Sequence, residues 1–149
     1  MKSISKSYGV PGLRLGILAS GDTDLISRLK RDVAIWNINS FGEFYLQIYE
    51  KYHKDYDEAC RSFIKEREMF FRELNEVPFL KVNSSQANYF LCEVTDRFTS
   101  RELAYLLLKK NILIKDCGSK KAFDGGNYIR LAVRDRRDNS YLVDILKSL

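Results

Sequence analysis

Two groups of residues in this 149-residue chain have types and spacings that could carry chemistry, and the first lies close to the N-terminus. Lys6 follows two hydroxyl residues, Ser3 and Ser5, and precedes the loop Gly9–Gly12, with Arg14 eight residues after the lysine. A lysine amine forms a Schiff base with an aldehyde. Hydroxyls and a guanidinium bind phosphate. The group suits a cofactor that is both an aldehyde and a phosphate ester, although a basic turn between two elements would contain the same residues.

The second group lies in the segment 128–134. Strand alternation would place Ile129, Leu131 and Val133 toward the core, with Arg130 and Arg134 on the opposite side. A guanidinium on a rigid strand can hold a carboxylate through two parallel hydrogen bonds. Taken alone, the strand favours a surface arginine in an ion pair. Together with the lysine group, it indicates a site for a substrate carboxylate.

The N-terminal group resembles a known signature. Ser3, Ser5 and Lys6, followed by Gly-Leu-Arg-Leu-Gly over 12–16, resemble the cofactor-lysine motif of class I and II pyridoxal-phosphate aminotransferases. The histidinol-phosphate aminotransferase and threonine-phosphate decarboxylase group is the most similar. The resemblance implies that Lys6 binds pyridoxal 5′-phosphate (PLP) covalently and acts in catalysis. It also implies that Ser3, Ser5 and Arg14 bind the cofactor phosphate.

The segments 112–117 and 128–134 resemble the same group. The resemblance implies that Arg130 binds the substrate carboxylate, and Arg134 is a further candidate for substrate binding. Where the family often has an arginine near the substrate, this chain has Lys115. Because lysine is a point charge without a planar fork, the identity of the substrate's second anionic group stays open.

The resemblance covers nearly all of the chain but only the C-terminal part of the family pattern. The upstream glycine-rich loop, the aromatic residue that stacks on the cofactor ring and the aspartate that pairs with the pyridine nitrogen are missing. We therefore expect a fragment that is inactive by itself, from a homodimeric enzyme that transfers an amino group between an amino acid or amino-alcohol phosphate and a 2-oxo acid. The alternatives are an amino-acid-phosphate decarboxylase and a non-catalytic, isolated C-terminal domain.

The hydrophobic pattern predicts an α+β fold, in which a mostly antiparallel sheet carries helices on one face. The expected division is a remnant of a large cofactor-binding domain over 1–34, interdomain helices over 35–77 and a small C-terminal domain over 78–149. Strands are predicted over 13–19, 79–82, 88–93, 112–116 and 128–133, and helices from 22–24 onward and over 41–52, 55–75, 99–110 and 135–149.

Side-chain patterns refine three of these helices. The first would turn Leu25, Ile26 and Leu29 inward, and the last would turn Tyr141, Leu142, Ile145 and Leu146 inward. Thr99 and Glu102 form a predicted capping box.

The segment 33–40 resembles the Trp-x-x-Asn-Ser stretch that crosses near the active site in the family, and a buried aromatic hinge explains it equally well.

Composition excludes several classes of protein. The 45% hydrophobic and 30% charged content is typical of a globular domain, and no apolar run reaches the length of a membrane span. Three cysteines without metal-type spacing and a single histidine argue against a metal site and for reduced thiols in the cytoplasm. The net charge of +5 comes from basic residues interleaved with acidic ones, which argues against a nucleic-acid partner.

Overall fold

The structure is a computed structural model that describes residues 1–120, 123 and 125–149, and only the backbone of Lys6 and Ser7. Its contacts divide the chain into two units, Met1–Cys60 and Arg61–Leu149, each of which is described by itself. The division at residues 34 and 77 stays a prediction. None of the described helices combines the length and apolar character needed to cross a membrane.

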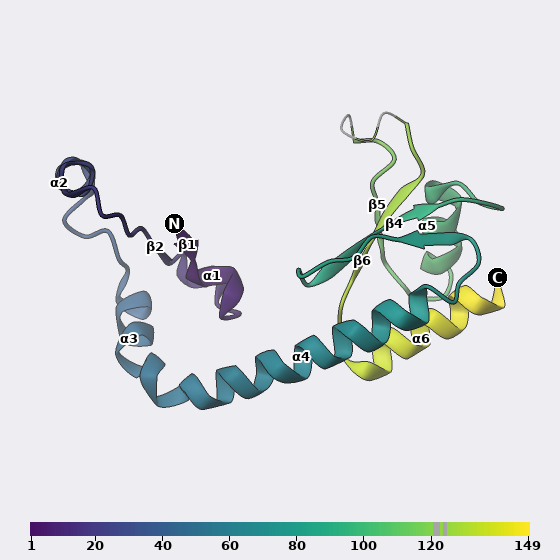
Figure 1. The fold of residues 1–149 in the computed structure, drawn as a ribbon, viewed down its shortest axis with the longest axis horizontal. Helices are drawn as coiled ribbons and strands as arrows, with labels where there is room; N and C mark the ends of the chain where they lie inside the picture. Colours follow the sequence, from purple (N-terminus) through teal and green to yellow (C-terminus); the bar gives the residue numbers. More distant parts are fainter. Residues whose placement is uncertain (121–122, 124) are drawn as a thin grey trace. The chain divides into compact units, whose positions relative to one another are not determined.

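The first unit consists of short elements (Figure 1). Strand β1 (Lys2–Ser3) pairs antiparallel with β2 (Gly16–Ile17), so only two residues of the predicted strand over 13–19 enter a sheet. Lys6 lies in the single turn α1 (Ile4–Ser7). The remaining elements are the 3-10 turns η1 (Pro11–Leu13) and η2 (Tyr49–Tyr52), the helices α2 (Thr23–Asp32) and α3 (Ser40–Ile48), and the start of α4 (His53–Leu74).

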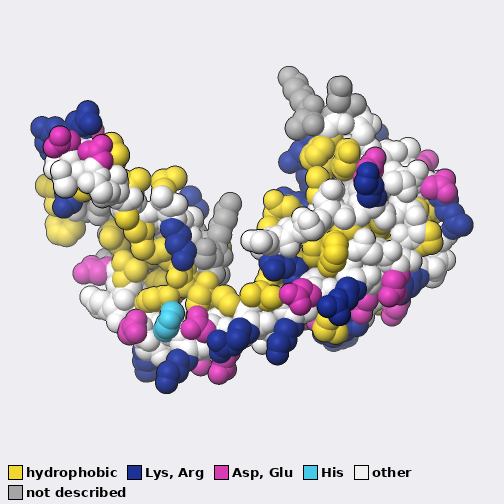
Figure 2. Space-filling model, viewed as in Figure 1, with side chains coloured by type: hydrophobic (Ala, Val, Ile, Leu, Met, Phe, Trp, Pro, Cys, Tyr) yellow, Lys and Arg dark blue, Asp and Glu magenta, His cyan; other side chains and the backbone are white. Residues whose placement is uncertain are grey.

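Few apolar side chains of the first unit are covered. Asp22 caps α2 by accepting a hydrogen bond from the Leu25 N–H, yet no residue of α2 is buried and Leu29 is 36% exposed, so the predicted inward face is wrong. Trp36 is 90% exposed, which also contradicts the buried aromatic hinge. The cause is the same for both, because no described element of the first unit packs over these side chains. Figure 2 shows hydrophobic side chains at the surface around this part of the chain.

The second unit has the predicted α+β fold. Its strands are β3 (Leu80–Val82), β4 (Tyr89–Val94), β5 (Lys115–Asp116) and β6 (Tyr128–Ala132), arranged in the order β3-β4-β6-β5 with every neighbouring pair antiparallel. The end of α4, α5 (Ser100–Leu108) and α6 (Arg136–Ser148) complete the unit. Only the last two residues of the predicted strand 112–116 pair with β6, and the predicted loop 118–126 contains three positions outside the described residues.

One face of this sheet is buried and the other is open. Phe90 and Cys92 on β4 are buried with Ile129 and Leu131 on β6, whereas the alternate side chains are exposed or half-buried. The core also contains Phe70 and Leu74 of α4, Leu103 and Leu107 of α5, and Leu142, Val143 and Leu146 of α6. The helices therefore cover one face, as predicted, and leave the face that carries Arg130 accessible.

The inward stripe of α6 differs from the predicted one. Tyr141 is 52% exposed, while Asn139 and Val143 are buried. Positions 139, 142, 143 and 146 have the i, i+3, i+4, i+7 spacing of one helix face, and Tyr141 lies off that stripe.

The capping box at α5 is confirmed and supports a stability prediction. The Thr99 side chain accepts a hydrogen bond from the Glu102 N–H at 3.2 Å, and the Thr99 N–H donates to the Glu102 carboxylate at 2.8 Å. We expect Thr99→Ala to cost about 1 kcal/mol of unfolding free energy, since one N–H of the first turn loses its acceptor. Urea denaturation measures this cost, and Thr95→Ala, another exposed threonine, should change stability by less than about 0.5 kcal/mol.

The same capping box predicts a pH dependence. Hydrogen bonds from the Thr99 N–H and hydroxyl lower the pKa of Glu102. Because the pKa is lowered on folding, the ionised Glu102 carboxylate makes its full contribution to stability above the pKa of the unfolded chain, about 4.3. That contribution is lost as the pH falls through the pKa of the folded chain. The difference in stability between the native chain and Glu102→Gln should therefore shrink on acidification. A difference that grows below pH 4 would contradict the assignment.

Candidate functional site

The lysine segment is held by hydrogen bonds to Leu15, the residue before β2. The N–H groups of Ile4 and Ser5 both donate to the Leu15 carbonyl, at 3.1 and 3.3 Å. The buried Ser5 hydroxyl donates to the same carbonyl at 3.2 Å and accepts from the Leu15 N–H at 2.9 Å. In this conformation Ser5 therefore stabilises the loop through Leu15, and its role in binding the cofactor phosphate stays a prediction. The side chain of Lys6 lies outside the description, and Ser3 lies on β1.

Arg14 offers an accessible cation at the end of the same loop. It follows η1, is exposed, and has a φ of 55°, in the left-handed region. The preceding residue is fixed by Asn39, whose Nδ2 donates to the Leu13 carbonyl at 3.0 Å. The Oδ1 of Asn39 accepts from the Gly42 N–H at 2.9 Å and caps α3. This role of Asn39 is not among the predicted ones, although an asparagine directly before a helical pattern is a recognisable cap signal.

Three tyrosine rings pack beside the lysine segment. The Tyr8 ring lies 5.1 Å from Tyr49 in an edge-on arrangement and 4.3 Å from Tyr56. A hydrogen bond from the Tyr49 hydroxyl lowers the pKa of Tyr8 and raises the pKa of Tyr49 to about 12. The Lys2 ammonium lies 3.5 Å from the Tyr8 hydroxyl and also lowers the pKa of Tyr8. This cluster holds the residue that follows α1 against the start of η2 and the start of α4.

The second unit contains a groove beside the open face of the sheet, with a volume of about 1340 Å³. Its lining includes the three residues predicted to bind substrate, namely Lys115, Arg130 and Arg134. Lys115 on β5 is the direct cross-strand partner of Arg130 on β6. Directly opposite residues in an antiparallel pair point to the same face. The fold thus brings together the three candidates on one surface.

Tyr89 orients the central arginine of this groove. The guanidinium carbon of Arg130 lies 5.2 Å from the centre of the Tyr89 ring, a cation–π contact. Tyr89 is the cross-strand partner of Ala132, so it lies diagonally from Arg130 on the same face. Within the described residues no hydrogen bond or ion pair occupies the guanidinium N–H groups of Arg130, so they are available to a carboxylate. Tyr89 is not among the predicted site residues, because the register of β4 against β6 is needed to find it.

The groove carries excess positive charge. Asp116 accepts hydrogen bonds from the Ser100 hydroxyl at 2.8 Å and the Gly118 N–H at 2.9 Å, and Asp138 pairs with Arg134. Within the described part of the chain, three basic lining residues form no ion pair with a carboxylate: Lys115, Arg130 and Arg137. The groove is therefore suited to an anionic ligand.

Known proteins are similar in sequence to this chain over nearly its whole length. The family model described as aminotransferase class I and II matches residues 1–146. An L-serine phosphate decarboxylase of Campylobacter jejuni is 33% identical over 100% of this chain and 38% of its own length. The threonine-phosphate decarboxylase of Salmonella typhimurium is 31% identical over 100% of this chain and 40% of its own length. The chain thus spans about two fifths of these relatives.

Solved structures agree with the sequence comparison. The histidinol-phosphate aminotransferase of Clostridium acetobutylicum has a TM-score of 0.86 at 28% identity, covering 98% of this chain and 43% of that structure. A decarboxylase from Sulfurospirillum multivorans has a TM-score of 0.82 at 32% identity, covering 99% of this chain and 42% of that structure. The family consists of PLP-dependent aminotransferases and decarboxylases. Because the family model matches residues 1–146, which include both the lysine segment and the Arg130 strand, this chain belongs to the class I and II aminotransferase family.

Proposed function

We propose that this chain is the C-terminal part of a PLP-dependent enzyme that transfers an amino group between an amino acid or amino-alcohol phosphate and a 2-oxo acid. The observation that carries the proposal is the exposed guanidinium of Arg130, which stacks on Tyr89 in a positively charged groove. A carboxylate is the ligand that such a fork binds best. We further expect a cytoplasmic enzyme whose complete form is a homodimer.

The roles of the chain's own residues follow from their chemistry. Lys6 would attach the cofactor, and its amine would then move a proton to and from the substrate α-carbon. Ser3, Ser5 and Arg14 would hold the cofactor phosphate, and the hydrogen bonds of Ser5 to Leu15 also keep the loop in place. Bound PLP supplies the electron sink for the bond that breaks at the α-carbon. Arg130 would fix the substrate carboxylate, with Lys115 and Arg134 beside it.

A second candidate function is decarboxylation of an amino-acid phosphate. Two of the similar proteins are named as L-serine phosphate and threonine-phosphate decarboxylases. The additional cations at 115 and 134, which line the same groove as Arg130, favour a substrate with a second anionic group. The orientation that Arg130 imposes on the carboxylate selects between loss of a proton and loss of carbon dioxide.

Covalent labelling tests the proposal. The purified chain is mixed with PLP, reduced with borohydride and mapped by mass spectrometry. We expect a pyridoxyl label concentrated on Lys6 and absent from Lys6→Ala, with no measurable transaminase turnover by this chain alone. Lys2→Ala, which removes a neighbouring lysine, serves as the control and should leave the Lys6 label unchanged. Label spread evenly over the exposed lysines would count against the proposal and favour a non-catalytic domain.

A further inference from the structure

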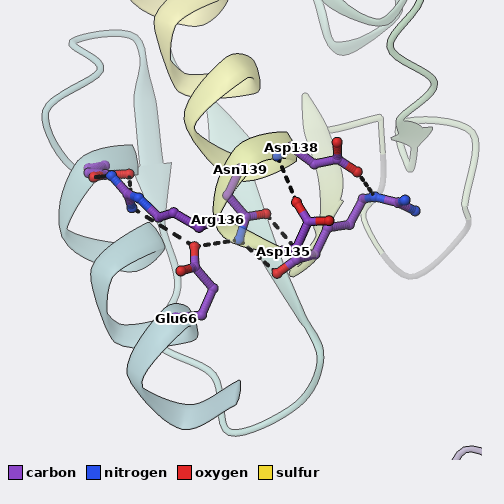
Figure 3. Close-up of polar contacts among 7 residues, drawn as sticks. Glu66, Asp135, Arg136, Asp138 and Asn139 are labelled. Atoms are coloured by element: carbon purple, nitrogen blue, oxygen red, sulfur yellow. Dashed lines mark hydrogen bonds and ion pairs between the residues drawn. The ribbon is translucent and has the colours of Figure 1, made fainter. Parts of the chain in front are cut away.

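A buried amide at the start of α6 has no role in the chemistry proposed above. Asn139 is 2% exposed, and burying an amide is costly unless its hydrogen bonds are made. Its Nδ2 donates to Oε1 of Glu66 at 2.8 Å and to the Arg134 carbonyl at 3.0 Å. Its Oδ1 accepts from the Arg134 N–H at 3.0 Å. Figure 3 shows these contacts, in which both amide protons and the oxygen are used.

These bonds satisfy the backbone N–H and carbonyl of Arg134 just beyond the end of β6, where no described strand pairs with them. Strand β6 ends at Ala132, and the Val133 N–H still donates to the Asn88 carbonyl at 2.9 Å. A side-chain amide presents the same donor and acceptor as a peptide group, so Asn139 replaces the missing strand partner of Arg134. Arg130 and Arg134 therefore keep the alternation of one strand, about 13 Å apart between Cα atoms at 3.3 Å per residue.

The Arg134 side chain is oriented from the same turn of α6. Asp138 accepts a hydrogen bond from Nε of Arg134, which raises the pKa of that guanidinium. The Asp135 carboxylate holds Asp138 in place by accepting a hydrogen bond from the Asp138 backbone N–H at 2.9 Å. Among the residues that the structure describes, the two Nη groups of Arg134 have no partner. Those Nη groups remain available to an anion.

Helix α4 fixes the orientation of the Asn139 amide. The Glu66 carboxylate can only accept hydrogen bonds, so Nδ2 of Asn139 must face it and Oδ1 must face the Arg134 N–H. Arg136 fixes α6 against α4 through two hydrogen bonds to Glu73, at 2.5 and 3.0 Å. The position of Arg134 thus depends on the packing of α4 against α6.

We propose that Asn139 is a positioning residue that presents Arg134 to a second anionic group of the substrate, the phosphate or phosphonate of an amino acid whose carboxylate Arg130 binds. The planar fork of an arginine suits a phosphate. Lys115 lies directly opposite Arg130 and therefore beside the carboxylate. This inference rests on the proposed function, because it takes Arg130 as the carboxylate site.

The experiment titrates the whole chain with O-phospho-L-serine and with L-serine, and follows the arginine Nε–H signals by NMR. We expect L-serine to shift the Arg130 signal alone, and O-phospho-L-serine to shift both Arg130 and Arg134 with at least tenfold tighter binding. Asn139→Ala should reduce that preference to less than threefold and leave L-serine binding unchanged. Arg134→Ala should give the same loss, and the double variant should lose nothing more, because both changes remove one interaction.

Ser140→Ala, the neighbouring position on α6, is the matched control and should keep the full preference for the phosphorylated ligand. If the amide spectrum shows that Asn139→Ala does not fold, Arg134→Ala and Asp138→Ala carry the test, because Asp138→Ala removes the acceptor of Arg134 Nε, and the same loss is expected. Equal weakening of both ligands in a folded Asn139→Ala would mean a purely structural role and overturn the proposal. O-phospho-L-serine that shifts only Arg130 would overturn it and leave the proposed function standing. No shift of Arg130 by either ligand would count against both.

Discussion

Phe70→Ala is expected to remove about 3–5 kcal/mol from the unfolding free energy of the second unit. Phe70 is fully buried on α4 and contacts Phe90 of the central strand β4 edge-on, with ring centres 5.9 Å apart. Truncation removes the burial of an aromatic ring and leaves a cavity between helix and sheet. Domains of this size have about 5–15 kcal/mol of stability, so the variant would be marginally folded.

Chemical denaturation followed by far-UV circular dichroism measures this effect. Met69→Ala is the matched control, because the neighbouring side chain on α4 is 43% exposed and its loss should cost less than about 1 kcal/mol. Similar losses for the two variants would mean that α4 does not pack on the sheet as described.

Arg130→Ala is expected to weaken the binding of L-serine by about 10- to 100-fold. A hydrogen bond to a charged group contributes about 1.5–3 kcal/mol, and each 1.4 kcal/mol corresponds to a tenfold change in the dissociation constant. Arg130 is exposed, so we take the range that a single such bond would give, although the fork can form two. Arg130→Lys should recover only part of the affinity, since an ammonium cannot bind a carboxylate bidentately.

NMR titration of amide signals measures the dissociation constants. Arg101→Ala is the control, because this exposed arginine on α5 does not line the groove. Tyr89→Leu removes the cation–π contact and should give a smaller loss of about threefold, from an interaction of about 0.5–1 kcal/mol at an exposed site. Unchanged affinity in Arg130→Ala would place the carboxylate elsewhere.

Local patterns predicted several features correctly because their partners lie within one turn or one strand. The capping box of Thr99 and Glu102 joins residues three positions apart. The alternation over 128–134 placed Arg130 and Arg134 on the face opposite the core, since the two-residue period of a strand needs no tertiary information. The motif around Lys6 likewise indicated the family that the comparison confirmed.

Side chains whose environment depends on distant segments could not be placed in this way. Asn139 is buried because Glu66, 73 residues earlier in the chain, lies across from it. The inward face predicted for α2 was wrong because periodicity shows which side of a helix is apolar, whereas burial requires another element to cover that side.

The family, the positions of the candidate lysine and arginine, and the antiparallel α+β class of the C-terminal part follow from the order of the residues alone. How those side chains are held depends on contacts between distant segments. The tertiary structure joins Lys115 to Arg130 through the register of β5 and β6, stacks Tyr89 on the guanidinium, and directs the Ser5 hydroxyl to Leu15. Cross-strand register and hydrogen-bond partners arise from packing between segments, and a one-dimensional pattern of residue types does not specify them.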